Sequence, residues 1–585
     1  MKMVKTLFKS VREYKLLSIL TPLSVTCEVI LEVILPTLMA KLIDQGIYAG
    51  SMPDTIRIGI ILFLTGMLSL FFGAISGLFG AKAGAGFAKN LRKDLYYKVQ
   101  SFSFANIDKF STSSLVTRLT TDVQNVQMAF QMLIRIAVRA PLMLVFSLVM
   151  AFRINTNIAL IFLCIIPVVG LILIAVGKAA HPYFEKVFKK YDDLNAIVEE
   201  NTQGMRVVKS FGLEEEEISK FKNKSNEIYE LFSKAERIIS FNQPIMQLTT
   251  YTVLLLIAWI GARIIITSNM TLLTTGELTS LITYATQILF ALMMVTMMFV
   301  LSTIAISSGK RIAEILNEEP SIKNKENPIK EVKNGSISFE NVSFSYVGKK
   351  EKEVLKNINL EIKSGETVGI IGGTGTGKST LVNLIPRLYD VTEGSLKVGD
   401  IDVRDYDIET LRDAVSCVLQ KNVLFSGTIK ENLRWGNENA SDEELIEACK
   451  LAEADGFINE FKDKYDTKIE QGGTNVSGGQ KQRICIARAL LKKPKILILD
   501  DSTSAVDTKT DKKIRDAFKS KIPDTTKIII AQRVASVEDA DKIIVMNNGK
   551  IDGIGTHEEL LKTNKIYKEV YESQTQVESE EGEVV

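Results

Sequence analysis

Six long apolar stretches occupy the first half of the chain, and they constrain its fold more than any other feature. Each is about as long as the roughly 20 residues that an α-helix needs to cross a bilayer. The first follows a run of lysines and arginines and is too long for a signal peptide, so we expect an uncleaved span with a cytosolic N-terminus. The sequence therefore predicts six membrane helices. They cover residues 16–43, 56–79, 128–152, 158–176, 244–266 and 278–305.

Two of the connectors, 80–127 and 177–243, are too long to be bare loops. Both carry helical periodicity, so the membrane helices are predicted to continue for about 20 residues, or about 30 Å, beyond the bilayer. Two helical hairpins should then project into the cytosol and turn near residues 112–122 and 204–211. Hairpins of this kind could act as levers on the membrane helices.

Ionisable side chains inside the predicted spans require partners. Glu28 and Glu32 lie one turn apart on the first span, and Arg135 and Arg139 lie one turn apart on the third. Two interpretations remain open at this point. The two pairs neutralise each other between helices, or they line a polar substrate cavity.

The sixth predicted span is rich in methionine, and Met293 and Met297 lie one turn apart on it. Methionine is flexible and polarisable, so this pattern is typical of plain helix packing and also of surfaces that contact ligands of varied shape. The pattern does not identify a substrate.

The composition argues against several classes of function. A net charge of +2 over 585 residues leaves no broad basic face for nucleic acid. The five cysteines form no C-x-x-C pair, and only two histidines are present, which argues against a zinc site, a disulfide framework and histidine-based catalysis. The charged segment 318–336 is predicted to be a linker, and the acidic end, 575–585, a disordered tail.

The second half alternates predicted strands and helices, which is typical of an α/β domain. A strand over 366–371 leads into GGTGTGKST, which satisfies the pattern G-x-x-x-x-G-K-[ST] and opens a helix. In such a loop the backbone amides surround phosphates, Lys378 reaches the β and γ phosphates, and Ser379 can ligate Mg²⁺. The predicted cofactors are therefore ATP and Mg²⁺. The predicted ATP-binding loop comprises Gly372, Gly373, Thr374, Gly375, Thr376, Gly377, Lys378, Ser379 and Thr380.

A second buried strand, KILILD, ends in Asp500, which could hold the water shell of the Mg²⁺ ion. With the phosphate loop followed by this strand and its terminal aspartate, the sequence resembles the ABC transporter family over essentially the whole chain. The resemblance implies a membrane all-α domain of six transmembrane helices with long cytosolic extensions (1–317), fused to an α/β P-loop nucleotide-binding domain (337–574). Fused domains of this kind resemble exporters.

Further motifs carry the resemblance. Gln420 is similar to the family's Q-loop glutamine near Mg²⁺, Tyr346 to the aromatic residue that stacks on adenine, and Asp507 to the D-loop aspartate. The segment VSGGQ of this chain resembles the family's signature motif, with Val476 where leucine is usual. In this family the signature of one chain closes over the ATP of another, so the resemblance implies a second chain as partner. The signature residues are Ser477, Gly478, Gly479 and Gln480.

The chain departs from the family pattern at two positions. Asp501 stands where the family has its general-base glutamate, and Gln532 stands where it has a switch histidine. Loss of one methylene withdraws the carboxylate by about 1.5 Å, and glutamine cannot become cationic near neutral pH. We therefore expect an impaired hydrolytic site beside an intact signature. This combination resembles the degenerate subunit of bacterial heterodimeric multidrug exporters, in the plasma membrane, with small amphipathic substrates.

Other functions remain as alternatives. An ATP-gated channel or a regulatory subunit would also use intramembrane charges, and a flippase for lipids or peptides would share the same framework. A soluble P-loop ATPase is disfavoured by the six apolar spans.

Overall fold

A computed structural model describes residues 2–501 and 505–582 of the chain, without the side chains of residues 2, 188, 192, 296, 297, 299–304 and 576–582. The chain divides into two compact units. Unit 1 comprises Met1–Ser101 and Ser111–Glu318, and unit 2 comprises Phe102–Phe110 and Glu319–Val585. The short segment Phe102–Phe110 therefore belongs with the second half of the chain, although it interrupts the first half.

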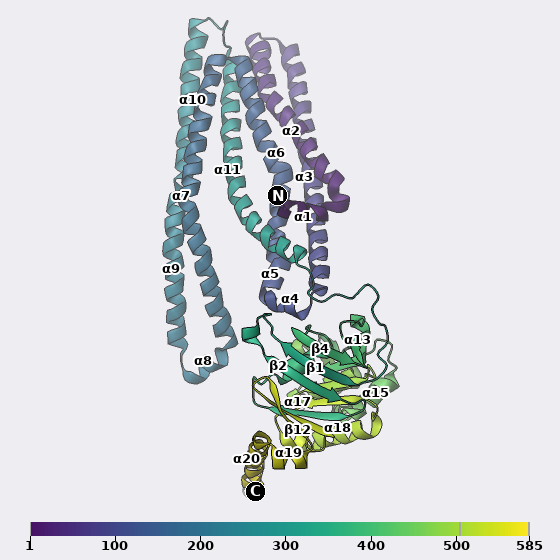
Figure 1. Cartoon of the computed structure of the whole chain (residues 1–585). Helices are drawn as coiled ribbons and strands as arrows, with labels where there is room; N and C mark the ends of the chain where they lie inside the picture. The colour runs from purple at the N-terminus through teal and green to yellow at the C-terminus, as the bar shows by residue number, and fades with distance from the viewer. Residues whose placement is uncertain (1, 502–504, 583–585) are drawn as a thin grey trace. The chain divides into compact units, whose positions relative to one another are not determined.

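The six predicted spans are confirmed in unit 1. Among the described residues, six helical stretches are long and apolar enough to cross a membrane. The helices that carry them are α2 (Lys15–Lys41), α3 (Met52–Gln100), α6 (Val123–Ile154), α7 (Thr156–Gln203), α10 (Asn242–Thr267) and α11 (Thr275–Asn317). Within this unit α2 packs against α3, α6 against α11 and α7 against α9 (Figure 1).

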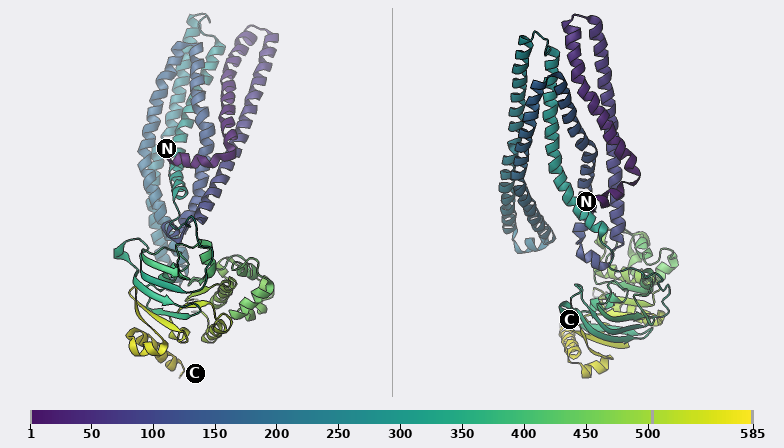
Figure 2. Two further views of the ribbon diagram at one scale, coloured as in Figure 1. Left: turned by 45° about the vertical axis from the view of Figure 1, so that its right-hand side comes forward. Right: turned by 45° about the horizontal axis from the view of Figure 1, so that its top comes forward.

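The predicted extensions of the membrane helices are also present. Helices α3 and α7 run without interruption to Gln100 and Gln203, well beyond their apolar segments. After α7, the short helix α8 (Met205–Phe211) forms the second turn where it was predicted, and α9 (Glu214–Ser240) returns beside α7 (Figure 2).

The first turn does not lie at 112–122, and that prediction was wrong. The chain turns at α4 (Phe104–Lys109), and α5 (Thr112–Thr117) and a π-helix (Arg118–Asp122) already lead into α6. The reason is local: Ser103 and Asn106 form a capping box that starts a new helix just after α3 ends.

Unit 2 is built on two main sheets. A four-stranded antiparallel sheet has the order β2-β1-β4-β5, and a six-stranded sheet has the order β12-β11-β3-β10-β9-β6, in which β12 alone runs antiparallel to its neighbour. The strands are β1 (Ile337–Phe344), β2 (Leu355–Ile362), β3 (Thr367–Gly372), β4 (Glu393–Val398), β5 (Ile401–Asp402), β6 (Val415–Val418), β9 (Ile496–Asp500), β10 (Thr526–Ile530), β11 (Lys542–Asn547) and β12 (Lys550–Gly555), with a small pair β7 (Gly427–Thr428) and β8 (Lys468–Ile469).

Helices cover these sheets and bury the central strands on both sides. Strands β9 and β10 are buried at every position, as expected for a parallel core. The helices of the unit are α12 (Lys378–Leu384), α13 (Ile408–Ala414), α14 (Ile429–Arg434), α15 (Asp442–Leu451), α16 (Asp455–Glu460), α17 (Gly478–Leu490), α18 (Thr508–Lys521), α19 (His557–Thr563) and α20 (Lys565–Gly582).

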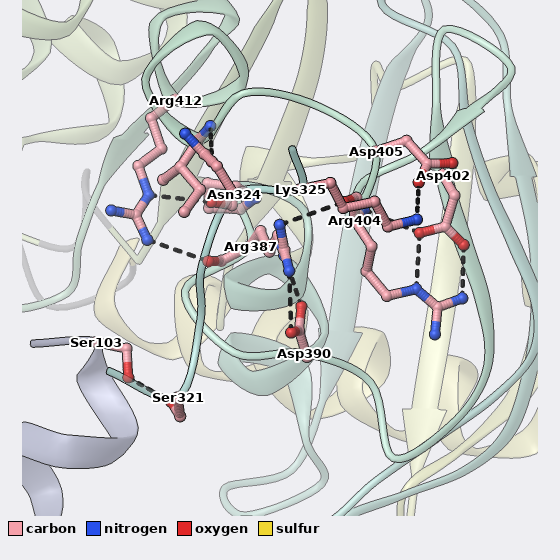
Figure 3. Close-up of polar contacts among 12 residues, drawn as sticks. Ser103, Ser321, Asn324, Lys325, Arg387, Asp390, Asp402, Arg404, Asp405 and Arg412 are labelled. Carbon is pink, nitrogen blue, oxygen red and sulfur yellow. Dashed lines mark hydrogen bonds and ion pairs between the residues drawn. The ribbon is translucent and has the colours of Figure 1, made fainter. Parts of the chain in front are cut away.

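The segment predicted as a linker is extended and is held along unit 2 by hydrogen bonds. The backbone of Ile329 pairs with Asp405 and Asp407 at N···O distances of 2.8 and 2.9 Å. Asn324 donates to the Asp407 carboxylate at 2.6 Å. Lys325 forms an ion pair with Asp405 (Figure 3). We call residues 319–333 the strap.

The acidic end of the chain was predicted to be disordered, and this prediction was wrong for residues 575–582. Helix α20 continues to Gly582, while 583–585 lie outside the described residues. Glutamate and glutamine are good helix formers, and a helix already anchored in the core can extend through them.

Candidate functional site

The phosphate loop joins β3 to α12. Gly375 and Gly377 have φ angles of +81° and +97°, which residues with a side chain rarely adopt. A Cβ atom at Gly377 would also lie 2.8 Å from Leu355 Cδ2. The loop therefore needs glycine at these positions to turn back and leave its amides at the start of α12. Thr380, in the first turn of α12, is buried.

Lys378 is the first residue of α12, and its ammonium lies on the loop itself. The Nζ atom donates to the carbonyls of Gly372 and Gly373 at 2.7 and 2.8 Å. Burial lowers the pKa of Lys378 below its usual range, and the carboxylates of Asp500 and Asp501 oppose this shift. The site therefore holds a partly desolvated cation where phosphate oxygens are predicted to bind.

Asp500 ends the buried strand β9 and lies next to Ser379. Burial raises the pKa of the Asp500 carboxyl above its usual range, and the nearby Ser379 hydroxyl opposes this shift. A hydroxyl and a buried carboxylate are hard oxygen donors, which Mg²⁺ takes together with substrate phosphates. These two residues therefore fit a magnesium ion. Gln420, the third residue predicted to lie near Mg²⁺, is exposed just beyond the end of β6.

Tyr346, which is predicted to stack on adenine, lies beside the phosphate-loop helix. Its hydroxyl is 3.0 Å from Thr380 Oγ1, and its ring is 47% exposed. The ring stands edge-on to Tyr389, with centroids 5.1 Å apart. Tyr389 in turn donates to Asp108 of α4 at 2.7 Å, and both its burial and this bond raise the pKa of Tyr389. No local pattern in the sequence singled out Tyr389.

The two residues that depart from the family pattern contact each other. Gln532 Nε2 donates to Asp501 Oδ2 at 2.9 Å. The Asp501 backbone is left-handed, with φ of +49°, and its N–H bonds to Ile530 O at 3.0 Å. The site thus brings together the phosphate loop, Asp500, Asp501 and the loop that carries Gln532.

The signature segment begins helix α17. Ser477 caps the helix and forms a capping box with Gln480, at 3.0 and 3.3 Å, and Ser477 and Gly478 are exposed. A Cβ atom at Gly479 would lie 2.7 Å from Ala505 O. Among residues 2–501 and 505–582, no hydrogen bond or ion pair joins this segment to the phosphate loop. Asp507 is exposed, and its carboxylate caps α18 by accepting a hydrogen bond from Thr510 N.

The intramembrane charges form a three-residue cluster in unit 1. Arg139 of α6 binds both Glu28 and Glu32 of α2, the latter at 2.7 Å. The guanidinium therefore neutralises carboxylates on the facing helix. Arg135 lies apart from this cluster, exposed and beside Gly77 of α3.

A cavity of about 310 Å³ adjoins the cluster. Met294 lines it, whereas Met293 is 50% exposed and is not among the lining residues, and the side chain of Met297 lies outside the described part of the chain. The sequence did not single out Gln287, although an amide inside an apolar span was an available signal. The cavity is lined by Glu32, Arg139, Met143, Thr286, Gln287, Phe290, Ala291 and Met294.

Two family profiles cover most of the chain. The profile of the ABC transporter transmembrane region matches residues 18–311, and that of the ABC transporter domain matches residues 355–504. The uncharacterized ABC transporter ATP-binding protein YfiB of Bacillus subtilis is 37% identical over 96% of this chain and 97% of its own length. A second such protein from B. subtilis, YknU, is 34% identical over 88% of this chain and 87% of its own length.

A solved structure has the same fold. A bacterial Atm1-family ABC exporter with ATP bound aligns with a TM-score of 0.82 and 24% identity over 96% of this chain and 99% of its own. The profiles, the relatives and the six spans fused to a phosphate-loop domain lead to one conclusion: the chain is a multi-pass membrane protein of the ABC transporter family, with an exporter-type fold.

Proposed function

We propose that the chain is one subunit of a heterodimeric, ATP-driven exporter in the plasma membrane. Its own site holds ATP and cleaves it slowly, while its signature motif completes the hydrolytic site of a different ABC chain. The observation that carries the proposal is the hydrogen bond between Gln532 and Asp501, because it joins the two departures from the family pattern at one place.

The residues around the phosphate loop suit ATP binding. Tyr346 offers an exposed ring for adenine, and the loop amides and Lys378 offer a positive field for the phosphates. Ser379 and Asp500 would hold Mg²⁺, which when bound screens the phosphate charges. The chain's own residues therefore supply groups for the adenine, the phosphates and the Mg²⁺ ion.

Slow cleavage follows from the position and the partner of Asp501. A general base must reach its water within hydrogen-bonding distance, and a displacement of about 1 Å can cost about 100-fold in rate. The Asp501 carboxylate is one methylene shorter than glutamate, and one of its oxygens already accepts from Gln532. The uncharged Gln532 also cannot supply the positive charge of a protonated histidine.

A second, different chain supplies what this one lacks. The signature segment is exposed at the N-terminus of a 13-residue helix, where backbone amides favour a phosphate on another molecule. Two copies of this chain would form two slow sites. A partner with the glutamate and the histidine would form one fast site beneath the signature of this chain.

The cavity beside Arg139 is the proposed site for a small amphipathic substrate. Met143, Phe290 and Met294 provide adaptable apolar contacts, and Glu32 and Gln287 provide polar ones. This combination suits molecules with an apolar body and a polar group.

Restoration of the family residues tests the proposal. We expect Asp501→Glu with Gln532→His to accelerate ATP cleavage at this site by up to about 100-fold, because the base would again reach its water. Single-turnover quench experiments on the purified complex measure it directly. The wild type should show a fast and a slow phase, and the slow phase should become fast in the double variant.

The matched control is Asp516→Glu, which adds the same methylene to an exposed aspartate of α18. It should leave both phases unchanged. If the wild-type complex shows one fast phase, or if the double variant leaves the slow phase as it was, the assignment of a slow site to this chain is wrong.

A further inference from the structure

The C-terminal helix reaches the loop that carries Gln532. In α20, the Gln574 side-chain amide uses both of its groups on that loop: Oε1 accepts from Val534 N at 2.8 Å, and Nε2 donates to Gln532 O at 2.8 Å. A single side chain therefore satisfies two main-chain groups on either side of Arg533. Val534 itself is 2% exposed, so its N–H lies where an unpaired donor would be unfavourable.

Helix α20 is anchored firmly enough to position this amide. Tyr567, two turns before Gln574, is fully buried, and its hydroxyl is 2.8 Å from His557 Nδ1. Its backbone N–H bonds to Asn564 Oδ1 at 2.8 Å. Val570 and Tyr571 pack against the core of the unit. Residues seven apart share a helix face, so the buried Tyr567 fixes the direction in which Gln574 points.

The contact continues into the ATP site. The main chain held by Gln574 belongs to Gln532, whose own side chain donates to Asp501 at 2.9 Å. Asp501 follows Asp500 at the end of β9, directly beside the phosphate loop. A continuous polar path thus runs from the C-terminal helix through the Gln532 loop to the site of the phosphates.

We propose that Gln574 is a positioning residue for the Gln532 loop, through which helix α20 controls how long nucleotide stays at this site. The inference goes beyond the heterodimer proposal and shares with it only the assignment of the nucleotide site. Slow hydrolysis is not required, because nucleotide release can be measured without cleavage.

Release of the non-hydrolysable analogue adenylyl imidodiphosphate from the purified complex provides the test. The kinetic phase of release that belongs to the site of this chain is the one that is absent in Lys378→Ala. We expect Gln574→Ala to accelerate this phase by about 10-fold, because two hydrogen bonds that order the loop are lost. Gln574→Glu keeps the acceptor for Val534 N and should fall between the wild type and Gln574→Ala.

A double-mutant cycle separates positioning from plain stabilisation. In a Gln532→Ala background, Gln574→Ala should cause little further acceleration, because its effect passes through Gln532. Thr575→Ala is the matched control: its hydroxyl donates to Tyr571 O of its own helix, and release should stay unchanged. Wild-type release in Gln574→Ala, or an undiminished effect without the Gln532 side chain, would overturn the proposal.

Discussion

At the scale of single residues, the protonation of Lys378 links ATP binding to pH. Burial lowers the pKa of its ammonium before ATP arrives, whereas phosphate oxygens favour the charged form. The pKa is thus higher with ATP bound than without it. ATP affinity should therefore be constant at pH values below the lowered pKa and should decrease as the pH rises through it, by up to about tenfold per pH unit.

Calorimetry between pH 7 and 10 tests this linkage, with proton uptake measured in buffers of different ionisation enthalpy. Lys378→Arg is the reference variant. Because arginine stays charged throughout this range, the ATP affinity of this variant should not decrease at alkaline pH. If ATP affinity decreased equally at alkaline pH in the wild type and in Lys378→Arg, a group other than Lys378 would be responsible.

The residues of the ATP site differ in how far the sequence could predict them. The phosphate loop and Asp500 were predicted because their chemistry resides in a contiguous motif and a strand end. The Gln532–Asp501 contact and the Tyr346–Tyr389 contact join segments that are separate in the chain, so only the folded structure reveals them. In unit 1 the charge pairing was one of two open interpretations, but the rotation of α6 decides that Arg139 and not Arg135 binds both glutamates.

At the scale of elements, α4 and the strap are joined through one buried side chain. Asn106, 4% exposed, accepts from Ser103 Oγ at 2.6 Å and from Ser321 N at 3.0 Å. Its Nδ2 donates to Glu319 O at 3.0 Å. Ser103 and Ser321 also bond to each other (Figure 3). Two segments that lie far apart in the sequence are therefore held together on unit 2.

We expect Asn106→Ala to destabilise this junction by about 1–3 kcal/mol, since it removes the hydrogen bonds that Asn106 makes to Ser103, Glu319 and Ser321. Hydrogen exchange on the purified complex should show faster exchange of residues 102–110 and 319–323 together. Asn439→Ala, at an exposed asparagine of the same unit, should change neither segment. Faster exchange of only one segment would mean that Asn106 does not join them.

Element boundaries show where sequence patterns stop being informative. The membrane helices were predicted because apolar length is a strong signal. The first turn was misplaced because a capping box of two small polar residues is a weak one. The end of α20 was misjudged because its anchor, the buried Tyr567, depends on the tertiary fold and not on the acidic composition that follows it.

At the scale of the whole molecule, the proposed exporter is formed by two unlike chains. In the proposed complex, the exposed signature of this chain closes over an ATP site on another molecule, and the signature of that partner closes over the phosphate loop of this chain. The proposed asymmetry is that the fast site is formed by the partner's phosphate loop and the slow site by the phosphate loop described above.

The most direct test is to purify the complex from its native membrane by a tag on this chain, and to determine both its subunits and its bound nucleotide after incubation with Mg²⁺ and ATP. Native mass spectrometry should show this chain with one different ABC transporter chain, and one ATP should remain uncleaved at the site that Lys378→Ala abolishes. A complex of two identical chains that converts all of its ATP to ADP rapidly would contradict the account.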